Sequence, residues 1–415
     1  MQTNLADFIK GTPDGDEAEA ILRACVHCGF CTATCPTYQL LGDELDGPRG
    51  RIYLIKQMLE GAPPTAKTQL HLDRCLTCRN CESTCPSGVK YGRLLDIGRR
   101  IVDERVPRKA ADRIKRTTLK EFLPRGMLFK PAFRVGAALR SVLSKDLQDK
   151  LQPARAAGLW PTRVHARKML VLEGCVQPAM GPNINAATAR VLDALGVQLV
   201  RAPRAGCCGA VRYHLNDQDG GLADMRRNID AWWPFVEGEG QVEAIVMTAS
   251  GCGVTVKEYG HLLAHDPAYA AKAARISMLT RDLSEIMPEF EEPLAARLRG
   301  KITQRVAFHP PCTLQHGQQI RGKVEGVLRA AGVDVVLCAD SHLCCGSAGT
   351  YSVLQPEIAH ALRDRKLANL EATGATEIVS ANIGCMTHLQ SGTGTPVTHW
   401  IELVDRALAL GRAPG

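Results

Sequence analysis

Apolar residues recur every three or four positions in the first hundred residues, which is the pattern of amphipathic helices. Between positions 49 and 61, Ile52, Ile55 and Leu59 follow this spacing, and Gly61 marks the end of the expected helix. Helices are also expected over 16–23 and 91–102. The amino-terminal part of the chain is therefore predicted to be helical.

From position 168 onward, short apolar runs alternate with helical stretches. Strands are expected at 169–172, 197–200 and 244–248, and helices at 184–195 and 222–236. The same order then returns, with strands at 306–308, 333–337 and 377–380 and helices at 323–331 and 356–372. Because alternating strands and helices of this length form helix-covered parallel sheets, two duplicated α/β domains are predicted.

Two cysteine runs lie in the helical part, and both read C-x2-C-x2-C-x3-C-P. The first extends from Cys25 to Pro36 and the second from Cys75 to Pro86. In the bacterial-ferredoxin run, three thiolates hold one [4Fe–4S] cluster and the fourth ligates the other cluster. Zinc sites usually combine two close ligands with two distant ones, which does not fit this spacing. The predicted ligand sets are Cys25, Cys28, Cys31 and Cys85 for cluster 1, and Cys75, Cys78, Cys81 and Cys35 for cluster 2.

Eight further cysteines form two matched sets in the α/β region. In each set a single cysteine precedes a Cys-Cys-Gly motif by 32 positions, and a last cysteine follows it. The single cysteines are expected just beyond strand ends, where open α/β sheets bind ligands. Each set could bind a further iron–sulfur cluster, form a redox-active thiol site, or consist of buried structural cysteines. The sets are Cys175, Cys207, Cys208 and Cys252, and Cys312, Cys344, Cys345 and Cys385.

Four histidines lie near the second set. They are expected either to carry protons during quinone or flavin reduction or to be hydrogen-bonded near loops. The remaining cysteine, Cys338, has no counterpart in the other half and is expected to be a core residue at a strand end. The four histidines are His309, His316, His342 and His388.

The predicted fold is α+β and multidomain. A helical ferredoxin domain with two [4Fe-4S] motifs (1–103) is followed by a basic, partly helical linker (104–167). Two duplicated Cys-Cys-Gly domains with parallel sheets then follow (168–300 and 301–415). The helical insert between the cysteine runs indicates the all-helical ferredoxin type.

The net charge of +8 is concentrated near the linker, where positions 99–168 hold 19 Lys or Arg and 6 Asp or Glu. This excess is typical of a solvated linker, and it would also suit an anionic partner or acidic lipid headgroups. A nucleic-acid partner is disfavoured, because no recognised binding motif accompanies the charge.

The chain lacks a secretory signal pattern and an apolar run long enough to cross a bilayer. The chain has 17 cysteines, eight of them at iron–sulfur cluster spacing, so it is expected in the reducing cytoplasm. Any membrane contact would be peripheral, on the inner face of the cytoplasmic membrane.

The motifs that would bind a nicotinamide, a flavin or a nucleotide phosphate are missing, as is the G-x-S-x-G elbow. No catalytic residue is assigned, and no flavin or NAD is expected on this chain. The chain therefore has the character of an electron conduit between other sites.

The order of a two-cluster ferredoxin module, a linker and two Cys-Cys-Gly domains resembles the iron–sulfur subunits of bacterial glycolate oxidase (glycolate dehydrogenase). The same order occurs in the iron–sulfur subunit of anaerobic glycerol-3-phosphate dehydrogenase, and the Cys-Cys-Gly domains are similar to those of heterodisulfide reductase and lactate-utilisation proteins. In the fullest family pattern, C-x-x-C ends each half, whereas here Thr255 and His388 occupy the final position. The segments that favour the glycolate family are Arg49-Gly-Arg-Ile-Tyr-Leu-Ile-Lys56, Glu173-Gly-Cys175-Val-Gln-Pro, Cys207-Cys208-Gly-Ala and Ser250-Gly-Cys252-Gly.

This resemblance implies the electron-transfer subunit of a membrane-associated glycolate:acceptor oxidoreductase. Flavin-binding partner subunits would oxidise glycolate to glyoxylate, and electrons would pass through two [4Fe-4S] clusters, and one or two more at the Cys-Cys-Gly sites, to a quinone-type acceptor. The alternatives are a glycerol-3-phosphate or lactate version of the same device. A remoter hypothesis is a redox-sensing protein that binds nucleic acid through the basic linker.

Overall fold

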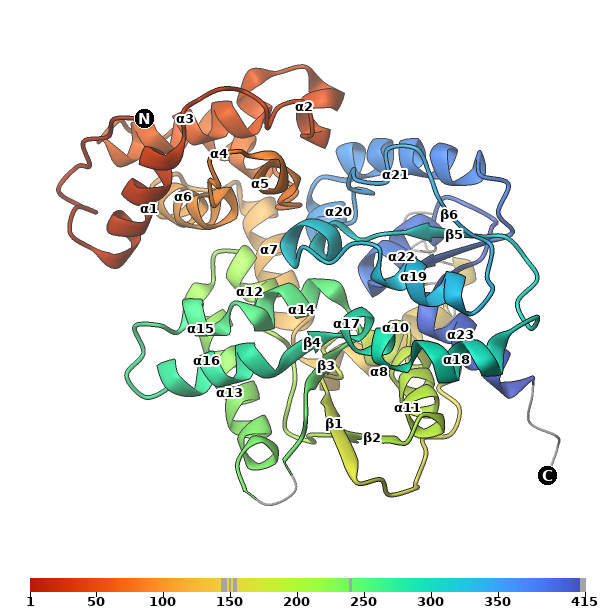
Figure 1. Ribbon diagram of the computed structural model, residues 1–415. Helices are drawn as coiled ribbons and strands as arrows, with labels where there is room; N and C mark the ends of the chain where they lie inside the picture. The colour runs from red at the N-terminus through yellow and green to blue at the C-terminus, as the bar shows by residue number, and fades with distance from the viewer. Residues whose placement is uncertain (143–147, 149–150, 152–154, 239–240, 411–415) are drawn as a thin grey trace. The chain divides into compact units, whose positions relative to one another are not determined.

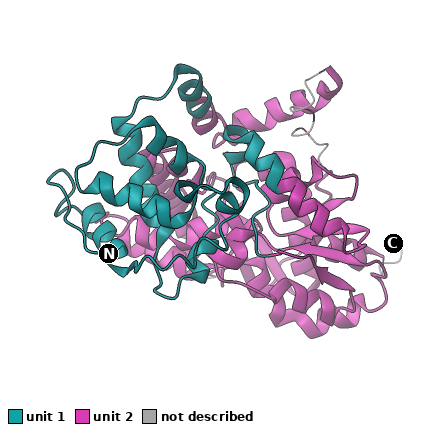
Figure 2. Ribbon diagram, turned by 90° about the horizontal axis from the view of Figure 1, so that it is seen from above, with its two compact units in different colours: residues 1–117, 342–362 teal, residues 118–341, 363–415 magenta. Residues whose placement is uncertain are grey.

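The computed structural model describes residues 1–142, 148, 151, 155–238 and 241–410. The described chain divides into two compact units, shown in two colours in Figure 2. The first unit comprises residues 1–117 and 342–362, and the second comprises 118–341 and 363–415. Each unit is described by itself, and the domain boundaries expected from the sequence stay predictions.

The first unit is helical. Its cysteine runs lie in the loops that connect short helices, and the long helix α6 packs against α1, α3 and α4. The helices expected over 16–23, 49–61 and 91–102 are confirmed as α1, α3 and α6. The elements are α1 (Pro13–Ala24), α2 (Pro36–Leu41), η1 (Glu44–Asp46), α3 (Pro48–Leu59), α4 (Ala66–Asp73), α5 (Asn80–Thr84), α6 (Tyr91–Arg105) and α20 (Tyr351–Leu354).

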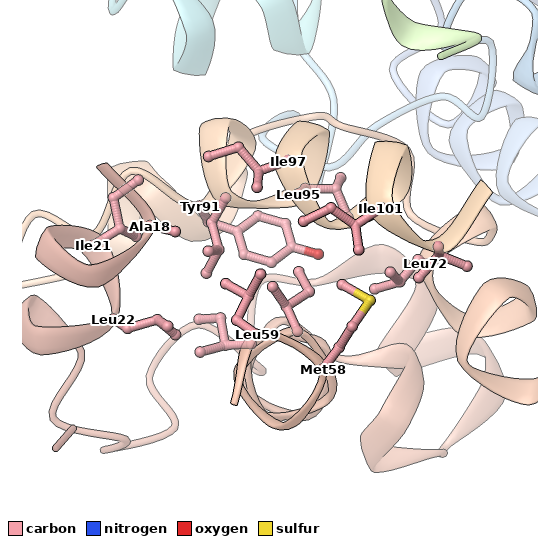
Figure 3. Close-up of a cluster of buried hydrophobic side chains, with 14 of the residues drawn as sticks. Ala18, Ile21, Leu22, Met58, Leu59, Leu72, Tyr91, Leu95, Ile97 and Ile101 are labelled. Atoms are coloured by element: carbon pink, nitrogen blue, oxygen red, sulfur yellow. The ribbon is translucent and has the colours of Figure 1, made fainter. Parts of the chain in front are cut away.

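The core of the first unit forms where the apolar faces of these helices meet (Figure 3). Leu22 of α1, Leu59 of α3 and Leu95 of α6 are buried there. Tyr91 extends into the same core, and its ring lies beside Leu95 in the close-up. This packing holds the two cysteine loops on rigid helices.

A buried ion-pair network also joins the helices of the first unit. Asp46 is fully buried, and its carboxylate accepts hydrogen bonds from Arg51 at 3.4 Å and Arg74 at 2.8 Å and contacts His71 Nδ1 at 3.0 Å. Because these partners compensate the buried carboxylate, Asp46 serves to hold η1, α3 and α4 together.

The segment 342–362 belongs to the first unit through specific contacts. The carbonyl oxygen of His342 accepts a hydrogen bond from Asn80 at 3.2 Å, and the Tyr351 hydroxyl donates to the carbonyl oxygen of Arg74 at 2.9 Å. Arg74 directly precedes the second cysteine run, and Asn80 lies within it. The second Cys-Cys-Gly motif therefore lies in the ferredoxin unit.

The second unit contains two parallel sheets of four strands within the described residues. The strand orders are β2-β1-β3-β4 and β6-β5-β7-β8, which are the same topology twice. In the first sheet, α11 lies on one side and α13 and α16 lie on the other (Figure 1). The strands are β1 (Arg167–Val171), β2 (Val197–Arg201), β3 (Ile245–Met247), β4 (Thr280–Asp282), β5 (Val306–His309), β6 (Val335–Leu337), β7 (Glu377–Ser380) and β8 (Val397–His399).

The helices of the second unit confirm the expected alternation. Those that follow the first-half strands are α10 (Gln177–Met180), α11 (Asn183–Ala194), α12 (Ala210–His214), α13 (Gln218–Val236), α14 (Ser250–Lys257), α15 (Tyr259–Leu262), α16 (Ala270–Leu279), α17 (Leu283–Ile286), η3 (Met287–Phe290) and α18 (Glu291–Leu298). Those of the second half are η4 (Thr313–Gly317), α19 (Lys323–Ala330), α22 (Ile383–Gln390) and α23 (Trp400–Ala409). Two helices, α7 (Ala110–Phe122) and α21 (Pro356–Glu371), extend across the boundary between the units.

Both fourth strands, β4 and β8, were absent from the expected elements. Each has three residues and includes polar side chains that are nonetheless buried, such as Asp282 and His399. Such strands lack the apolar run that reveals the others in the sequence.

Part of the basic linker is helical, as expected. It contains α8 (Gly126–Ala138), which is followed by the short η2 (Arg140–Val142). Along the described chain, no helix combines the length and apolar character needed to cross a bilayer.

Candidate metal centres

The two ferredoxin-type loops share an unusual backbone. Within the C-x2-C-x2-C part, His27 and Gly29 of the first loop have positive φ, and so do Thr77 and Arg79 at the equivalent positions of the second. Left-handed residues next to right-handed ones form concave nests of backbone N–H groups that bind anions. Since three of these four residues have a side chain that disfavours positive φ, the strained backbone makes both loops candidate binding sites.

The first cavity lies within the ferredoxin helices and has an empty volume of about 450 Å³. Its walls include all four cysteines of the predicted cluster 1, namely Cys25, Cys28, Cys31 and Cys85. Burial first, and then the nearby thiolates of Cys25, Cys85 and Cys28, raise the pKa of Cys31 to about 11. Four thiolates so close to each other would repel, and a bound metal cluster would compensate their charge.

The second cavity, of about 300 Å³, is lined by Cys35, Cys75, Cys78 and Cys81, which are the four cysteines predicted for cluster 2. The pKa of Cys81 is raised well above its usual value by burial and by the other three thiolates. Cys81 and Tyr91 line both cavities, so the two sites are neighbours. The donor sets fit two clusters, and the ligand assignment itself stays a prediction.

Two buried arginines surround the second loop. Arg51 lines the second cavity and donates to the carbonyl oxygen of His71 at 2.7 Å. Although burial opposes its charge, the thiolates of Cys75 and Cys35 raise the pKa of Arg51. Arg99 donates to the carbonyl oxygen of Cys75 at 2.7 Å. The second site therefore carries more buried positive charge than the first, where Arg49 is 35% exposed.

Tyr351 connects the second ferredoxin site with the second Cys-Cys-Gly motif inside the first unit. Its hydroxyl donates to the carbonyl oxygen of Arg74, next to Cys75, and its pKa is raised by burial and then by the charges of Cys75 and Cys344. Cys344 is 3% exposed. The second cysteine pair thus lies near the cluster-2 loop, a proximity that the sequence separation conceals.

The first Cys-Cys-Gly set comes together in the second unit. Side-chain hydrogen bonds connect Cys175 to Cys207, Cys207 to Cys208, and Cys208 to Cys252, so the four thiols form a continuous chain. Contacts among the thiols and burial raise the pKa values of Cys175, Cys207 and Cys208. A buried chain of thiols with elevated pKa values fits a metal cluster that would take them as thiolates.

Two polar side chains hold the loop that carries this cysteine pair. Asn228 of α13 donates to the carbonyl oxygen of Cys207 at 2.7 Å, and the Tyr259 hydroxyl donates to that of Cys208 at 2.8 Å. Asn228 also accepts a hydrogen bond from the backbone N–H of Gly206. The sequence reasoning missed both residues, because neither belongs to a motif and their roles arise from tertiary contacts.

The glycine after each cysteine pair is required by close packing. Gly209 and Gly346 both have φ near +90°. A Cβ at Gly209 would lie 2.7 Å from the carbonyl oxygen of Gly221, and one at Gly346 would lie 2.4 Å from that of Ala359. In both halves the group that an added Cβ would crowd is a backbone carbonyl of a helix, α13 in the first half and α21 in the second.

The cysteines of the second set divide between the units. Cys312 precedes η4, Cys385 lies in the first turn of α22, and both are buried in the second unit. Cys344 and Cys345 belong to the segment 342–362 and are buried in the first unit. Cys338 is buried just after β6, as expected for a core residue.

The rims of the two sheets meet within the second unit. The Ser250 and Thr313 hydroxyls are 2.7 Å apart, and Gln318 donates to the carbonyl oxygen of Ser250 at 3.0 Å. Asn382 accepts from the backbone N–H of Gly251 at 3.4 Å and donates to Sγ of Cys385 at 3.4 Å. The loop that carries Cys252 is thereby connected to the site of Cys385.

The four histidines differ in their surroundings. His309 is 1% exposed, and burial, followed by the positive charge of Lys366, keeps its pKa well below the usual value. His316 and His388 are also buried, whereas His342 is exposed. A buried neutral His309 is not in contact with solvent protons, so the expected role as a proton carrier finds no support at this position.

Family models match three parts of the chain. A 4Fe-4S dicluster domain matches residues 21–89, which contain both ferredoxin-type loops. A cysteine-rich domain matches twice, at residues 169–257 and 306–390. The duplication inferred from cysteine spacing is thereby confirmed.

Curated relatives match the whole chain or part of it. The glycolate oxidase iron-sulfur subunit of Escherichia coli is 56% identical over 98% of this chain and 99% of its own length. The probable glycolate oxidase iron-sulfur subunit of Bacillus subtilis is 30% identical over 91% of this chain and 90% of its own length. Lactate utilization protein A of Bacillus licheniformis is 26% identical over 53% of this chain and 89% of its own length.

Proposed function

The chain belongs to the family of glycolate oxidase iron–sulfur subunits, and from this premise we propose a specific electron path. Electrons leave glycolate at a flavin on a partner chain, which releases glyoxylate, and this chain delivers them to a quinone-type acceptor. The cofactor chemistry, the transfer of single electrons, would be supplied by bound iron–sulfur clusters. The grouping of eight cysteines around two adjoining cavities is the observation that carries the proposal.

Each ferredoxin-type loop would contribute three ligands to one cluster and one ligand to the other. Cluster 1 would be held by Cys25, Cys28, Cys31 and Cys85, and cluster 2 by Cys75, Cys78, Cys81 and Cys35. The lining of the two cavities supports this exchange of the fourth ligand. Three of the four cluster-2 cysteines are buried, whereas Cys28 of the cluster-1 set is exposed, so cluster 1 would be the more accessible to water.

The Cys-Cys-Gly sites would bind one or two additional clusters. The chain of four thiols from Cys175 to Cys252 supports a cluster in the first half. Because the domain is duplicated, a second cluster is expected in the second half. Its ligands would be Cys312, Cys344, Cys345 and Cys385. Tyr351, which lies close to Cys75 and Cys344, marks the route by which electrons would pass from cluster 2 to the second Cys-Cys-Gly site.

The residues of this chain have three tasks in the proposed path. The nests at His27 and Thr77 orient N–H groups toward negative charge. Arg51 and Arg99 add buried positive charge beside cluster 2, which favours its reduced state. Asn228 and Tyr259 fix the loop of the first cysteine pair.

The decisive experiment is anaerobic purification together with the flavin subunits, followed by iron analysis and low-temperature EPR. We expect about eight irons per chain, or about twelve to sixteen if the Cys-Cys-Gly sites are loaded, at four irons per cube. Glycolate should reduce the clusters, whereas lactate and glycerol 3-phosphate should reduce them poorly. Fewer than about four irons per chain, or reduction by lactate alone, would contradict the proposal.

A matched set of cysteine variants tests the ligand exchange. Cys85→Ser should alter the EPR signal that Cys28→Ser also alters, although the two residues lie in different runs. Cys338→Ser is the control, because this buried cysteine lies outside every predicted set. If Cys85→Ser instead altered the signal affected by Cys78→Ser, the exchange would be wrong.

We also propose that α8 contacts an anionic membrane surface. Phe129 and Phe133 of α8 are buried in a hydrophobic cluster with Ala179. Met127 and Val135 of the same helix are 93% and 59% exposed. Lys130 on the same helix is exposed and has no ion-pair partner among the described residues. Exposed apolar side chains beside unpaired positive charge match the requirements of an interfacial helix.

Flotation with lipid vesicles tests this contact. The complex should float with phosphatidylglycerol-containing vesicles and much less with phosphatidylcholine vesicles, and Met127→Ser/Val135→Ser should reduce flotation. The control Phe8→Ser changes another exposed apolar residue, which lies outside α8. Equal flotation of the double variant would assign α8 to a protein partner instead.

A further inference from the structure

His309 ends the central strand β5 of the second sheet, three positions before Cys312. The equivalent position in the first half, three before Cys175, is Leu172, which is 3% exposed. The two sheets have the same topology, so the fold itself accepts an apolar side chain at this position. An imidazole there therefore needs a reason other than packing.

The imidazole of His309 is buried, and its two ring nitrogens make no hydrogen bonds within the described residues. Buried polar groups are nearly always paired, since an unpaired one loses its interaction with water without compensation. Two orphaned ring nitrogens on one fully buried side chain indicate a bound group that supplies the missing interaction.

A metal-ligating thiol lies beside this imidazole. A ring nitrogen of His309 and Sγ of Cys385 lie within 4.8 Å of each other. Cys385 is 4% exposed and receives a hydrogen bond from Asn382, as expected of a sulfur that carries negative charge. A nitrogen and a sulfur this close to each other can ligate the same metal atom.

We propose that His309 is an imidazole ligand of the iron–sulfur cluster in the second Cys-Cys-Gly half. The two halves would then differ, with thiolates alone in the first and a mixed set of thiolates and imidazole in the second. A neutral imidazole adds no negative charge, so the second-half cluster has the higher reduction potential, as when histidines replace cysteines in Rieske centres. Electrons would therefore accumulate on the second-half cluster, from which the proposed path delivers them to the acceptor.

This inference rests on the proposed cluster in the second half. Its test uses the complex labelled with ¹⁵N-histidine, prepared anaerobically, reduced with dithionite and measured by HYSCORE. The unlabelled protein should show a ¹⁴N coupling of a directly bound imidazole, and labelling should change it to the ¹⁵N pattern. His309→Leu, which copies the first half, should abolish that coupling, whereas His399→Asn, at another buried histidine, should retain it.

A second variant keeps the test informative if His309→Leu fails to bind iron. His309→Cys supplies a thiolate instead of the imidazole, so a cluster should form without the nitrogen coupling and with a more negative potential in an EPR-monitored redox titration. The ferredoxin signals and their eight irons should persist in all variants, which separates failure of this inference from failure of the electron-transfer function. Absence of any histidine-dependent coupling, zinc at the site, or an unchanged spectrum of His309→Leu would overturn the proposal.

Discussion

The Asn382 side chain donates a hydrogen bond to Sγ of Cys385 at a distance of 3.4 Å. The carbonyl oxygen of the same amide accepts from the backbone N–H of Gly251, next to Cys252. One amide thus connects the rims of the two duplicated sheets, and it contacts a candidate cluster ligand in the second half and the residue before one in the first. Hydrogen bonds to a ligating sulfur raise the reduction potential of a cluster. Asn382 should therefore raise the reduction potential of the proposed cluster in the second half.

Asn382→Ala should lower the reduction potential of the second-half cluster. Loss of the N–H···S hydrogen bond removes a donor that stabilises the more negative reduced state, and the expected shift is on the order of tens of millivolts. An EPR-monitored redox titration of the complex measures it. The matched control is Asn369→Ala, which removes an exposed amide from α21, and its potentials should equal those of the unchanged protein. A shift of equal size in both variants would contradict the assignment.

Arg51→Gln should make cluster 2 more difficult to reduce. The buried guanidinium interacts with the thiolates of Cys75 and Cys35, so its removal should shift the potential to more negative values by several tens of millivolts. The remaining partners of Asp46, His71 and Arg74, should keep the local fold.

Two further variants show whether the effect of Arg51 depends on its charge and on its burial. Arg51→Lys retains the charge and should preserve most of the potential. Arg49→Gln removes an arginine that lines the first cavity but is partly exposed, so it should shift cluster 1 only slightly. If Arg49→Gln produced the larger shift, burial would not be the deciding factor.

The cysteine pattern and most of the secondary structure could be predicted from the sequence because their signals are local. The ferredoxin runs have fixed spacing, the strand β3 is a continuous apolar run, and β5 begins with one. The strands β4 and β8 lack such runs, since Asp282 and His399 are polar residues buried by tertiary contacts. Their burial depends on partners distant in sequence, which no local pattern can reveal.

The surroundings of the candidate sites were predicted less completely for the same reason. Asn228 and Tyr259 hold the Cys207-Cys208 loop across separations of 21 and 51 positions. Tyr351 is hydrogen-bonded to Arg74 across 277 positions. The sequence predicts which cysteines are candidate metal ligands. The residues that orient the cysteine loops can be identified only from the folded structure.

Gly209→Ala should destabilise the second unit strongly. Positive φ costs a side-chain-bearing residue about 1–2 kcal/mol, and the contact of Cβ with the carbonyl oxygen of Gly221 at 2.7 Å adds about 1–3 kcal/mol of overpacking. The control is Gly196→Ala, which has φ of +84° but no heavy atom of the described chain within 4 Å of its Cβ. Thermal unfolding followed by circular dichroism should show a much larger decrease in Tm for Gly209→Ala. Equal decreases would mean that the close approach to α13 relaxes at little cost.

His399 should make the stability of the second unit sensitive to acid. It is fully buried, its Nε2–H donates to the carbonyl oxygen of Thr248 at 2.9 Å, and its Nδ1 accepts from the backbone N–H of Ile401. Burial lowers the pKa of His399 to about 3 from its usual 6.5. Because the unfolded chain binds the proton more tightly, this stabilising contribution is complete above pH 6.5 and is lost as the pH falls toward 3.

His399→Asn isolates this effect, because asparagine can still cap α23 but does not titrate. The unchanged protein should be more stable at pH 7.5 by an amount on the order of a few kcal/mol, and the difference should shrink steadily below pH 6.5. Thermal unfolding midpoints of both proteins, measured anaerobically between pH 4 and 8, provide the comparison. Glu402, which accepts from the backbone N–H of His399, is present in both proteins, so its own titration largely cancels in the difference. A difference in Tm that stayed constant across this range would show that a charged His399 is tolerated in the folded state, and the contact with Thr248 would then be structural without being pH-sensitive.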